Sequence, residues 1–574
     1  MQQESPARYD LWLPKSILAL RQYTVRKFIS DLIAGFTVGL VALPLAMAFA
    51  ISSGLPPQAG LYTAVVAGFL ISALGGSLTQ IGGPTGAFVV IVFGIVAKYG
   101  VDGLFLCTLM AGILLVILGV TGFGTAVRFI PRPVVIGFTN GIAVLIASTQ
   151  IKDFFGLKID KIPGDFLGRM EAIGSSFNTF SLESTFLAGT SLVLIIFSMR
   201  YIKRVPGSII ALFAGTALSL ILKLNVETIG TRFGGIPRGL PHLTAPHFSH
   251  ETLHAMIALL SPAITVAMLG AIESLMSAVV SDRMSGDKHN PNVELIAQGV
   301  ANIASPLFGG LPATGAIART ATNIRSGAKS PVAGIVHALT LLAVLLFAAP
   351  LASYIPLPVL AAILMIVSYN MGEWKEIPQL FKLTWADISV WFVTFALTVF
   401  ADLTTAVESG MIWAALLYIR KVTNTTTVSE VNEDYIEDAR VHILQDKQIP
   451  EYVKIFRIHG PFLFGATEKI AEVTKNVSDL PPIVILRLRN MTAVDGTGLH
   501  ALEELAQQLR SSGRTLLLCG AREQPAQLMH QTEFEQHVGG QNICPHIEAA
   551  LERAREIHAN PLPPQEAVAG VVGN

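Results

Sequence analysis

The chain of 574 residues has no formal net charge, and 52% of its residues are hydrophobic while only 14% are charged. Soluble domains are nearer a quarter charged, so this composition excludes an ordinary soluble protein and predicts long segments within a lipid bilayer. The zero net charge gives no general attraction for nucleic acid or acidic partners. The chain has three cysteines, Cys107, Cys519 and Cys544. Their spacing fits neither a metal site nor a disulfide framework.

The first long apolar stretch runs from Leu32 to Ala97 without any Asp, Glu, Lys, Arg or His. A helix needs about 20 apolar residues to cross a bilayer, so this stretch has room for three crossings. Further apolar segments reach Val422, and together they predict an all-α polytopic membrane protein with about 14 transmembrane helices. We expect these at 31–51, 58–77, 84–98, 103–122, 132–150, 182–199, 205–222, 252–280, 293–309, 314–325, 331–349, 357–372, 384–401 and 404–420.

The basic residues of the loops predict the orientation, because cytoplasmic loops carry an excess of Lys and Arg. Residues 1–30 are polar and basic, without a cleavage motif for a removable signal peptide, and are expected in the cytoplasm. Arg128, Arg200 and Arg325 fall in loops on the same side. An even number of crossings leaves both termini in the cytoplasm, and the expected location is the cell membrane, inner or plasma.

Two similar short motifs indicate an internal repeat. GGPTGAF occupies Gly82–Phe88 and LPATGAI occupies Leu311–Ile317, each at the start of a short apolar segment. Seven crossings per half is an odd number, so the halves 31–225 and 252–422 are expected to form an inverted repeat, with a transport site at the motifs. The alternative is that their small residues only let helices pack closely.

After Thr427 the charges become frequent and the apolar residues alternate. The alternation of strand and helix patterns is typical of a small α/β domain, expected over 436–556. The tail 557–574 has the composition of a disordered segment. The expected strands are 452–459, 482–488 and 514–519, and the clearest helix is 499–510.

An anion within a bilayer needs hydrogen-bond donors, but isolated charges there are costly. A helix N-terminus offers unpaired N–H groups and about half a positive charge, so two facing helix starts make an anion site. Pro84 and Pro312 are expected to begin the two short helices. Arg319 lies about one turn further on, in contact with the substrate or in a structural role. The candidate substrate-binding residues are Thr85, Gly86, Ala87, Thr314, Gly315, Ala316 and Ile317.

Glu273 stands in the apolar run MLGAIESLMSAVV, and a carboxylate in such a place is a functional candidate by default. It precedes Thr314 by 41 residues, the same separation as between Pro44 and Thr85, which supports a central position. One interpretation is a proton carrier. A second is a cation ligand together with Ser277, one turn on. A third is a glutamate held by a neighbouring helix.

Several segments resemble the SulP family of anion transporters, which includes solute carrier family 26. They are ALPLAMAFAISSGLPPQAGLY at Ala42–Tyr62, IGGPTGAF and LPATGAIARTATNIRSGA. In the C-terminal part, IVILRLRNMTAVDGTGLHALEEL is similar to a STAS domain. The resemblance spans about Asp31 to Glu556. It implies a seven-plus-seven inverted repeat like that of uracil permease, a homodimer, and an elevator-like motion between a core and a gate domain.

The resemblance also implies roles for single residues. It places the anion between the third and tenth helices, with the family's aromatic residue of the first helix at Phe49 and its carboxylate of the eighth helix at Glu273. Some animal members have Gln where this chain has Leu45, so their anion preference does not transfer. In the STAS-like part Asp495 is followed by Gly496, where the related anti-sigma-factor antagonists have a phosphorylatable Ser.

The expected STAS domain is therefore a docking or regulatory module without a phosphorylation switch, with an unidentified cytoplasmic partner. Thr497 is expected to cap its helix at 498–510. The expected function is secondary transport of a small anion of the sulfate, bicarbonate or dicarboxylate class, coupled to protons. The alternatives are sodium-coupled bicarbonate symport, an uncoupled exchanger or channel, and a non-transporting sensor. No GxSxG or P-loop motif is present, so no enzyme is predicted, and no cofactor beyond a proton or sodium ion.

Overall fold

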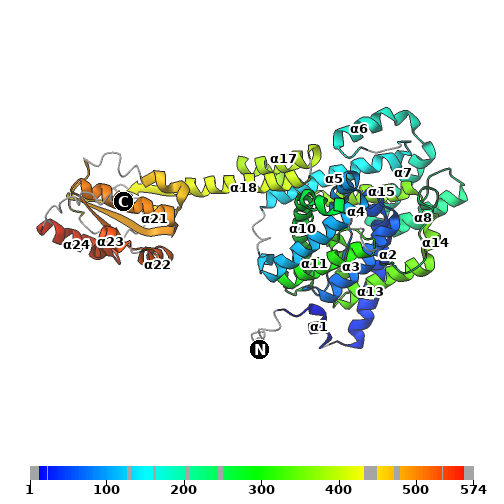
Figure 1. Ribbon diagram of the computed structural model, residues 1–574, viewed down its shortest axis with the longest axis horizontal. Helices are drawn as coiled ribbons and strands as arrows, with labels where there is room; N and C mark the ends of the chain where they lie inside the picture. The colour runs from blue at the N-terminus through cyan, green and yellow to red at the C-terminus, as the bar shows by residue number, and fades with distance from the viewer. Residues whose placement is uncertain are drawn as a thin grey trace. The chain divides into compact units, whose positions relative to one another are not determined.

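The computed structural model describes residues 12–21, 23–125, 131–159, 163–201, 206–243, 250–401, 403–431, 449–470, 479–532 and 534–560 (Figure 1). The chain divides into two compact units, Met1–Ala414 and Ala415–Asn574. The first unit is built almost entirely from helices, and the second holds a five-stranded sheet with helices.

The first unit consists of two successive sets of helices, each with one very short strand. The first set is α1 (Lys15–Leu20), α2 (Val25–Ser52), α3 (Pro57–Leu74), β1 (Gly82–Gly83), α4 (Gly86–Val120), α5 (Arg132–Phe155), α6 (Phe166–Ser175), α7 (Leu182–Tyr201), α8 (Gly207–Ile221) and α9 (Ile229–Phe233). The second set is α10 (His250–Ser285), α11 (Pro291–Leu307), β2 (Thr314–Gly315), α12 (Ile317–Arg325), α13 (Val332–Ala343), α14 (Ala349–Ala352), α15 (Leu357–Met371), α16 (Ile377–Leu380), α17 (Trp385–Phe400) and α18 (Leu403–Thr425).

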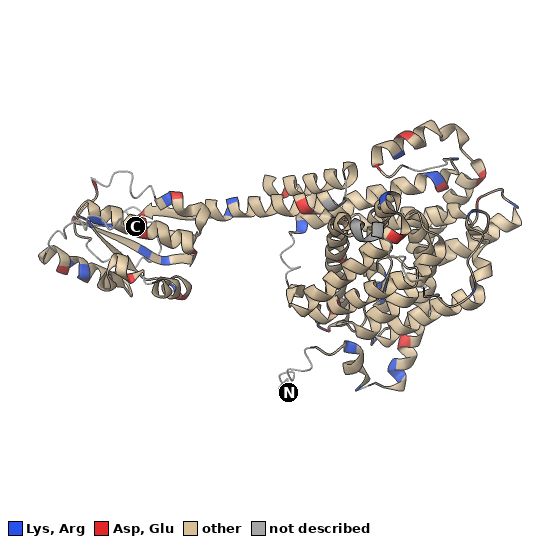
Figure 2. Cartoon of the chain, viewed as in Figure 1, with Lys and Arg blue, Asp and Glu red and all other residues tan. Residues whose placement is uncertain are grey.

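Among the described residues, seven helical stretches are long and apolar enough to cross a membrane. They are α2, α3, α4, α5, α7, residues 256–285 of α10 and the continuous stretch 332–352. Shorter apolar helices are α8, α15 and α17. Charged side chains are sparse along the helices of this unit (Figure 2). The polytopic all-α membrane fold is therefore confirmed. A helix lies on each of the expected apolar segments, but the number of crossings stays a prediction.

The order of elements in the second set repeats that of the first. After α1, the first set continues with the two helices α2 and α3, and the second set begins with the two helices α10 and α11. Each pair is followed by a two-residue strand and then by another helix. The two sets also pack on each other reciprocally, α4 on α10 and α11, and α13 on α2 and α3. This reciprocity supports an inverted repeat, whose limits of 31–225 and 252–422 stay a prediction.

Local sequence explains where some helices begin and break. α4 covers both expected segments 84–98 and 103–122, which are separated at Gly100, whose φ of 72° lies outside the helical region. α2 begins at Val25, before the expected Asp31, because the Thr24 side chain accepts a hydrogen bond from the Lys27 N–H as an N-cap.

The second unit is a mixed sheet with helices on both faces. Its strand order is β3-β4-β5-β6-β7, with β3 antiparallel to β4 and the other neighbours parallel. Val484 of β5 packs with Leu502 of α21 in one buried cluster, and Ile485 packs with Leu551 of α24 in another. The elements are β3 (Thr427–Glu430), β4 (Val453–Phe462), β5 (Ile483–Val494), α21 (Gly496–Ser511), β6 (Thr515–Cys519), α22 (Glu523–Gln531), α23 (Glu535–Val538), β7 (Ile543–Cys544) and α24 (Ile547–Ala559).

The expected strands and helix of this unit are present, and the two edge strands were missed. β3 and β7 span four and two residues, too few for an alternating pattern to stand out. α24 continues to Ala559, so the expected disordered tail begins too early, and residues 561–574 lie outside the described part.

The predicted Thr497 cap is wrong. α21 begins at Gly496, so Thr497 lies within its first turn, and the Asp495 carboxylate accepts a hydrogen bond from the Gly498 N–H at 2.8 Å. The same carboxylate accepts one from the Phe464 N–H at 3.1 Å. Asp495 therefore caps α21 and also ties it to the helical segment Phe464–Ile470, which follows β4.

Candidate functional site

The site is built on the pairing of two very short strands, one from each half of the first unit. β1 and β2 run antiparallel, with Gly82 opposite Gly315 and Gly83 opposite Thr314. α4 begins three residues after β1, and α12 begins two residues after β2. The pairing therefore brings the starts of two helices from distant parts of the sequence into one place.

The helix starts differ from the prediction in the second half. Thr85 is the N-cap of α4, so Gly86 and Ala87 are its first two residues, as expected. In the second half Thr314 and Gly315 form β2, and α12 begins only at Ile317. Pro84 and Pro312 were predicted to begin the two helices, but neither does. Extended backbone separates each proline from the helix that follows it.

Glycine is required at the strand pair because other groups approach closely. A Cβ on Gly315 would lie 1.7 Å from Nε2 of Gln80, and one on Gly83 would lie 2.8 Å from Nη1 of Arg319. Gly83 also has a φ of +147°, which disfavours other residues. Gln80 Nε2 donates to the Ser274 carbonyl at 3.1 Å, and thereby holds the strand pair against α10.

Buried polar side chains hold both ends of the pair. Asn302 of α11 donates to the Ala313 carbonyl and accepts from the Ala313 N–H, both at 2.8 Å. The Thr320 hydroxyl accepts from the Ile81 N–H at 3.0 Å. These residues, like Gln80 and Ser274, were not selected from the sequence. Their only signal was a polar side chain within or beside an apolar segment, which does not reveal the partner.

Glu273 of α10 lies at the start of α4. The Thr85 hydroxyl donates to its carboxylate at 2.9 Å. The Glu273 side chain is only partly buried. Arg319 is close enough for the two charges to interact. The structure therefore brings together three predicted residues, Glu273, Thr85 and Arg319.

Arg319 is a buried cation between the two halves. It is 3% exposed, and its Nη2 donates to the Pro84 carbonyl in the loop that leads into α4. Its Nη1 has no hydrogen-bond partner among the described residues. Arg319 thus has a structural contact across the repeat and also an unused donor.

The donors of the second half are mostly used within the protein. The Thr314 hydroxyl donates to the Gly270 carbonyl at 3.0 Å. The Gly315 N–H donates to the Ser274 hydroxyl at 3.3 Å, and the Ala316 N–H to the Ile81 carbonyl at 2.8 Å. The first N–H of α12 belongs to Ile317, whose side chain is 40% exposed. Among the four predicted residues of the second half, Ile317 is thus the one best placed to donate its N–H to a ligand.

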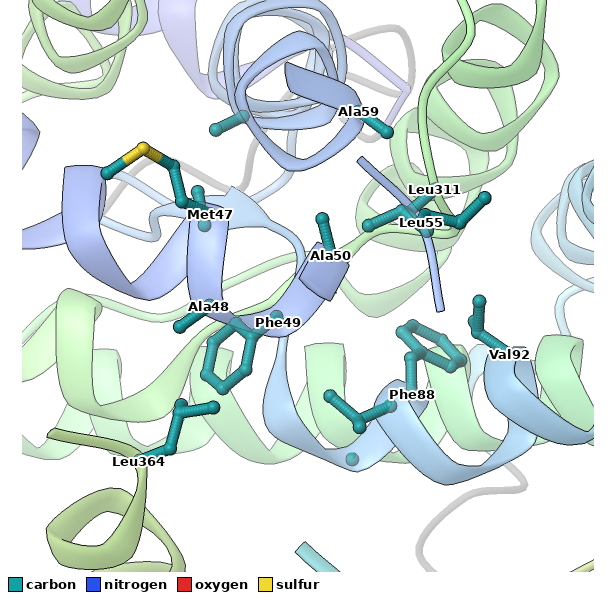
Figure 3. Packing of buried hydrophobic residues seen from close by; sticks show 14 of the residues in the cluster. Met47, Ala48, Phe49, Ala50, Leu55, Ala59, Phe88, Val92, Leu311 and Leu364 are labelled. Atoms are coloured by element: carbon teal, nitrogen blue, oxygen red, sulfur yellow. The ribbon is translucent and has the colours of Figure 1, made fainter. Parts of the chain in front are cut away.

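Apolar side chains from other helices cover the start of α4. A Cβ on Gly86 would lie 3.3 Å from the Phe49 ring, 3.2 Å from Ile146 and 3.4 Å from the Met371 sulfur. Figure 3 shows Phe49 of α2 and Phe88 of α4 in one packed cluster. Phe49 is 4% exposed, so it forms an apolar wall close to the first N–H groups of α4.

Ser277 does not contact Glu273 by any hydrogen bond in the described residues. It is fully buried, and its hydroxyl lies 3.1 Å from that of Thr320. Among the described residues, no group of three or more His, Cys, Asp or Glu side chains is arranged to hold a metal ion. The arrangement therefore connects Ser277 to the strand pair and leaves Glu273 with Thr85 and Arg319.

Comparison with known proteins agrees with this architecture. The family model described as the sulfate permease family matches residues 28–394, more than half of the chain. The chain belongs to the sulfate permease family. A second model, for the STAS domain, matches residues 445–550. This family consists of multi-pass membrane transporters of anions and not of enzymes, and the chain is one of its members.

The relatives of this family member include bacterial transporters. A putative sulfate transporter of Bacillus subtilis, YvdB, is 41% identical over 91% of this chain and 97% of that protein. The bicarbonate transporter BicA of Picosynechococcus is 29% identical over 92% and 95%. The solved transmembrane domain of a cyanobacterial BicA has a TM-score of 0.60 at 32% identity, covering 68% of this chain and 98% of that one. Murine Slc26a9, an anion transporter solved in the inward-facing state, has a TM-score of 0.85 at 19% identity, covering 96% of both, which shows the fold alone.

α10 of this sulfate permease family member begins with HETLH at 250–254, which has the HExxH spacing of zinc proteases. The side chains of this segment lie outside the described part of the chain. A lone pentapeptide of this kind is a weak signal, and membership in a transporter family gives it no enzymatic role.

Proposed function

We propose that this protein is a secondary active transporter of a small anion of the sulfate, bicarbonate or dicarboxylate class, and that it couples transport to protons through Glu273. The observation that carries the proposal is the hydrogen bond from Thr85 to Glu273 at the start of α4, beside the buried Arg319. A titratable carboxylate thus adjoins the donors that would hold an anion.

The anion is proposed to bind between the starts of α4 and α12. Gly86 and Ala87 offer the first N–H groups of α4, Ile317 offers that of α12, and Arg319 adds an unused donor and a full positive charge. Backbone donors recognise charge and size, so oxyanions of different chemistry fit. Sulfate and bicarbonate are favoured because YvdB is a putative sulfate transporter and BicA is a bicarbonate transporter.

Proton coupling is proposed to arise because the contacts of Glu273 with Thr85 and Arg319 depend on whether its carboxylate is ionised or protonated. Ionised Glu273 accepts a hydrogen bond from Thr85 and attracts Arg319. The positive charge of Arg319 is then neutralised by Glu273 and is not free to bind an anion. Protonated Glu273 releases Arg319 for the anion. A proton and an anion therefore favour the same state of the site, which is the requirement for symport.

Movement is proposed to be elevator-like, in a homodimer with both termini in the cytoplasm of a cell-membrane protein. β1 and β2 fasten α4 and α12 to each other, so the anion site would travel as one body. The STAS unit is proposed to bind an unidentified cytoplasmic partner, without a switch at Gly496.

The test is uptake of labelled sulfate, bicarbonate and succinate into proteoliposomes with an imposed proton gradient, for the native chain and for Glu273→Gln. Gln keeps an oxygen that accepts from Thr85, so the fold is expected to persist. We expect concentrative uptake to be lost and the pH dependence to flatten, while counterflow exchange continues. Accumulation with an unchanged pH profile in Glu273→Gln would refute the coupling role.

A matched control is Glu294→Gln. Glu294 of α11 is another buried carboxylate, which accepts from the Gly76 N–H and from the Gln298 side chain, both at 2.9 Å. Neither partner belongs to the start of α4 or of α12. Its variant is expected to keep the native pH profile. The same vesicles test the alternatives, because sodium dependence at fixed pH indicates sodium symport and large unitary currents indicate a channel. Tight anion binding without flux indicates a sensor.

A further inference from the structure

An open groove lies on the surface of the first unit between α7 and α15, which pack against each other. Its volume is about 640 Å³. Most of its lining is apolar, with Leu192 and Ile196 from α7 and Met365 and Ile366 from α15. It is remote in sequence from every residue proposed to bind the anion or the proton.

The groove lies on a part of the surface that is expected to contact lipid. α7 is the least buried of the seven helical stretches that could cross a membrane. Ile196 and Met199 are 52% and 55% exposed, although both are large and apolar. Water would make such exposure costly, so a hydrocarbon environment explains it.

One end of the groove is polar. Arg200 lies in the last turn of α7, and Tyr369 and Asn370 lie in the last turn of α15. All three are exposed, and Arg200 forms no hydrogen bond or ion pair with any described residue. The excess of basic residues in the neighbouring loops predicts that this end is cytoplasmic. Leu192 and Arg200 are eight residues apart along α7, so the apolar part extends about 12 Å from the cation.

We propose that this groove binds one anionic phospholipid. An acyl chain lies against Leu192, Ile196 and Met365, and the phosphate is held by Arg200, with the Tyr369 hydroxyl and the Asn370 amide as further donors. The charge of Arg200 matches that of an acidic headgroup at the level where headgroups lie. The apolar trough and the polar end each fit one part of the same molecule.

A second hollow on α7 provides an internal comparison. It has a volume of about 540 Å³ and is lined by residues such as Thr185, Gly189 and Val193, with no charged side chain in its lining. It offers surface to an acyl chain but nothing to an acidic headgroup. Of these two hollows, only the Arg200 groove is therefore expected to select anionic lipid.

The test is lipid binding to the purified full-length chain by native mass spectrometry, with phosphatidylglycerol and phosphatidylcholine of identical acyl chains. One basic residue near a headgroup predicts a preference for phosphatidylglycerol of about fivefold. Arg200→Gln is expected to remove the preference while keeping acyl-chain binding. Leu192→Trp fills the trough and is expected to lower binding of both lipids there. Arg283→Gln, an exposed arginine in the last turn of α10, is the charge-matched control and is expected to keep the native preference.

An unchanged preference in Arg200→Gln, or an equal loss in Arg283→Gln, would overturn the proposal. A second copy of the chain is the competing occupant of the groove. Ile196→Cys tests it, because the three native cysteines are buried. Efficient disulfide-linked dimers of Ile196→Cys in liposomes would place a protomer in the groove and exclude the lipid. None of these outcomes depends on which anion or ion is transported.

Discussion

Thr85 connects the carboxylate of α10 to the start of α4 by a single hydroxyl. Its backbone is extended, with φ of −126° and ψ of 159°, and its side chain makes no capping bond to α4. Its one side-chain hydrogen bond in the described structure goes to Glu273. Because the backbone conformation suits a β-branched residue, the hydroxyl can be removed without changing the local fold.

Thr85→Val is therefore expected to lower anion uptake by roughly tenfold or more, since a hydrogen bond to a charged group contributes about 1.5–3 kcal/mol. Thr85→Ser keeps the hydroxyl and is expected to restore most of the rate. The measurement is initial uptake in proteoliposomes, with the folded fraction checked by size-exclusion chromatography. Equal uptake by the Val and Ser variants would show that the hydroxyl has no part in transport.

Single residues were predictable from the sequence where they break an apolar pattern. Glu273 and Arg319 stand out as charges in apolar surroundings, and the structure brings them together with Thr85. The supporting partners Asn302 and Thr320 did not stand out. Which backbone group a buried polar side chain meets depends on how distant helices pack, and no local pattern contains that information.

The strand pair β1–β2 is the element on which the site depends. Each strand has two residues, so no alternating pattern predicts it, and only the similar motifs around the two strands indicate the place. The error in the start of α12 has the same cause, because Thr314 and Gly315 are extended by pairing with Gly83 and Gly82. Long apolar helices were predicted well, since their signal is local and extends over many residues.

Gly315→Ala tests the close approach at this pair. The added Cβ would meet the Gln80 amide at 1.7 Å, so Gln80 must leave the Ser274 carbonyl, at an expected cost of about 1–3 kcal/mol. We expect transport to fall sharply and the thermal midpoint of the protein to drop.

Two further variants make this prediction specific. Gly94→Ala in α4 adds a Cβ that meets nothing within 4 Å, so transport and stability are expected to be retained. In the double variant Gly315→Ala with Gln80→Ala, the space is restored and part of the lost stability is expected to return. A Gly315→Ala protein as stable and active as the native chain would contradict the geometry of the strand pair.

At the scale of the whole molecule the chain is two units with separate cores. The largest apolar cluster lies wholly in the first unit, and the clusters on the two faces of the sheet lie wholly in the second. The family models also match the units separately, at 28–394 and 445–550. Units with their own cores are expected to fold as separate cooperative bodies.

The native cysteines test this independence, because Cys107 lies in the first unit and Cys519 and Cys544 in the second, all buried. Burial raises the pKa of the Cys519 thiol to about 12, so alkylation at pH 8 requires unfolding of its surroundings.

Leu486→Ala removes a fully buried side chain from the sheet and is expected to destabilise the second unit by about 2–5 kcal/mol. Pulsed alkylation across a urea series, read by peptide mass spectrometry, should show Cys519 and Cys544 reacting at lower urea while Cys107 is unchanged. Gln507→Ala, on the exposed side of α21, is the control and should shift neither transition. If Cys107 moved together with Cys519 in the Leu486→Ala protein, the two units would form one cooperative body, and a partner that binds the STAS unit would act directly on the stability of the transport unit.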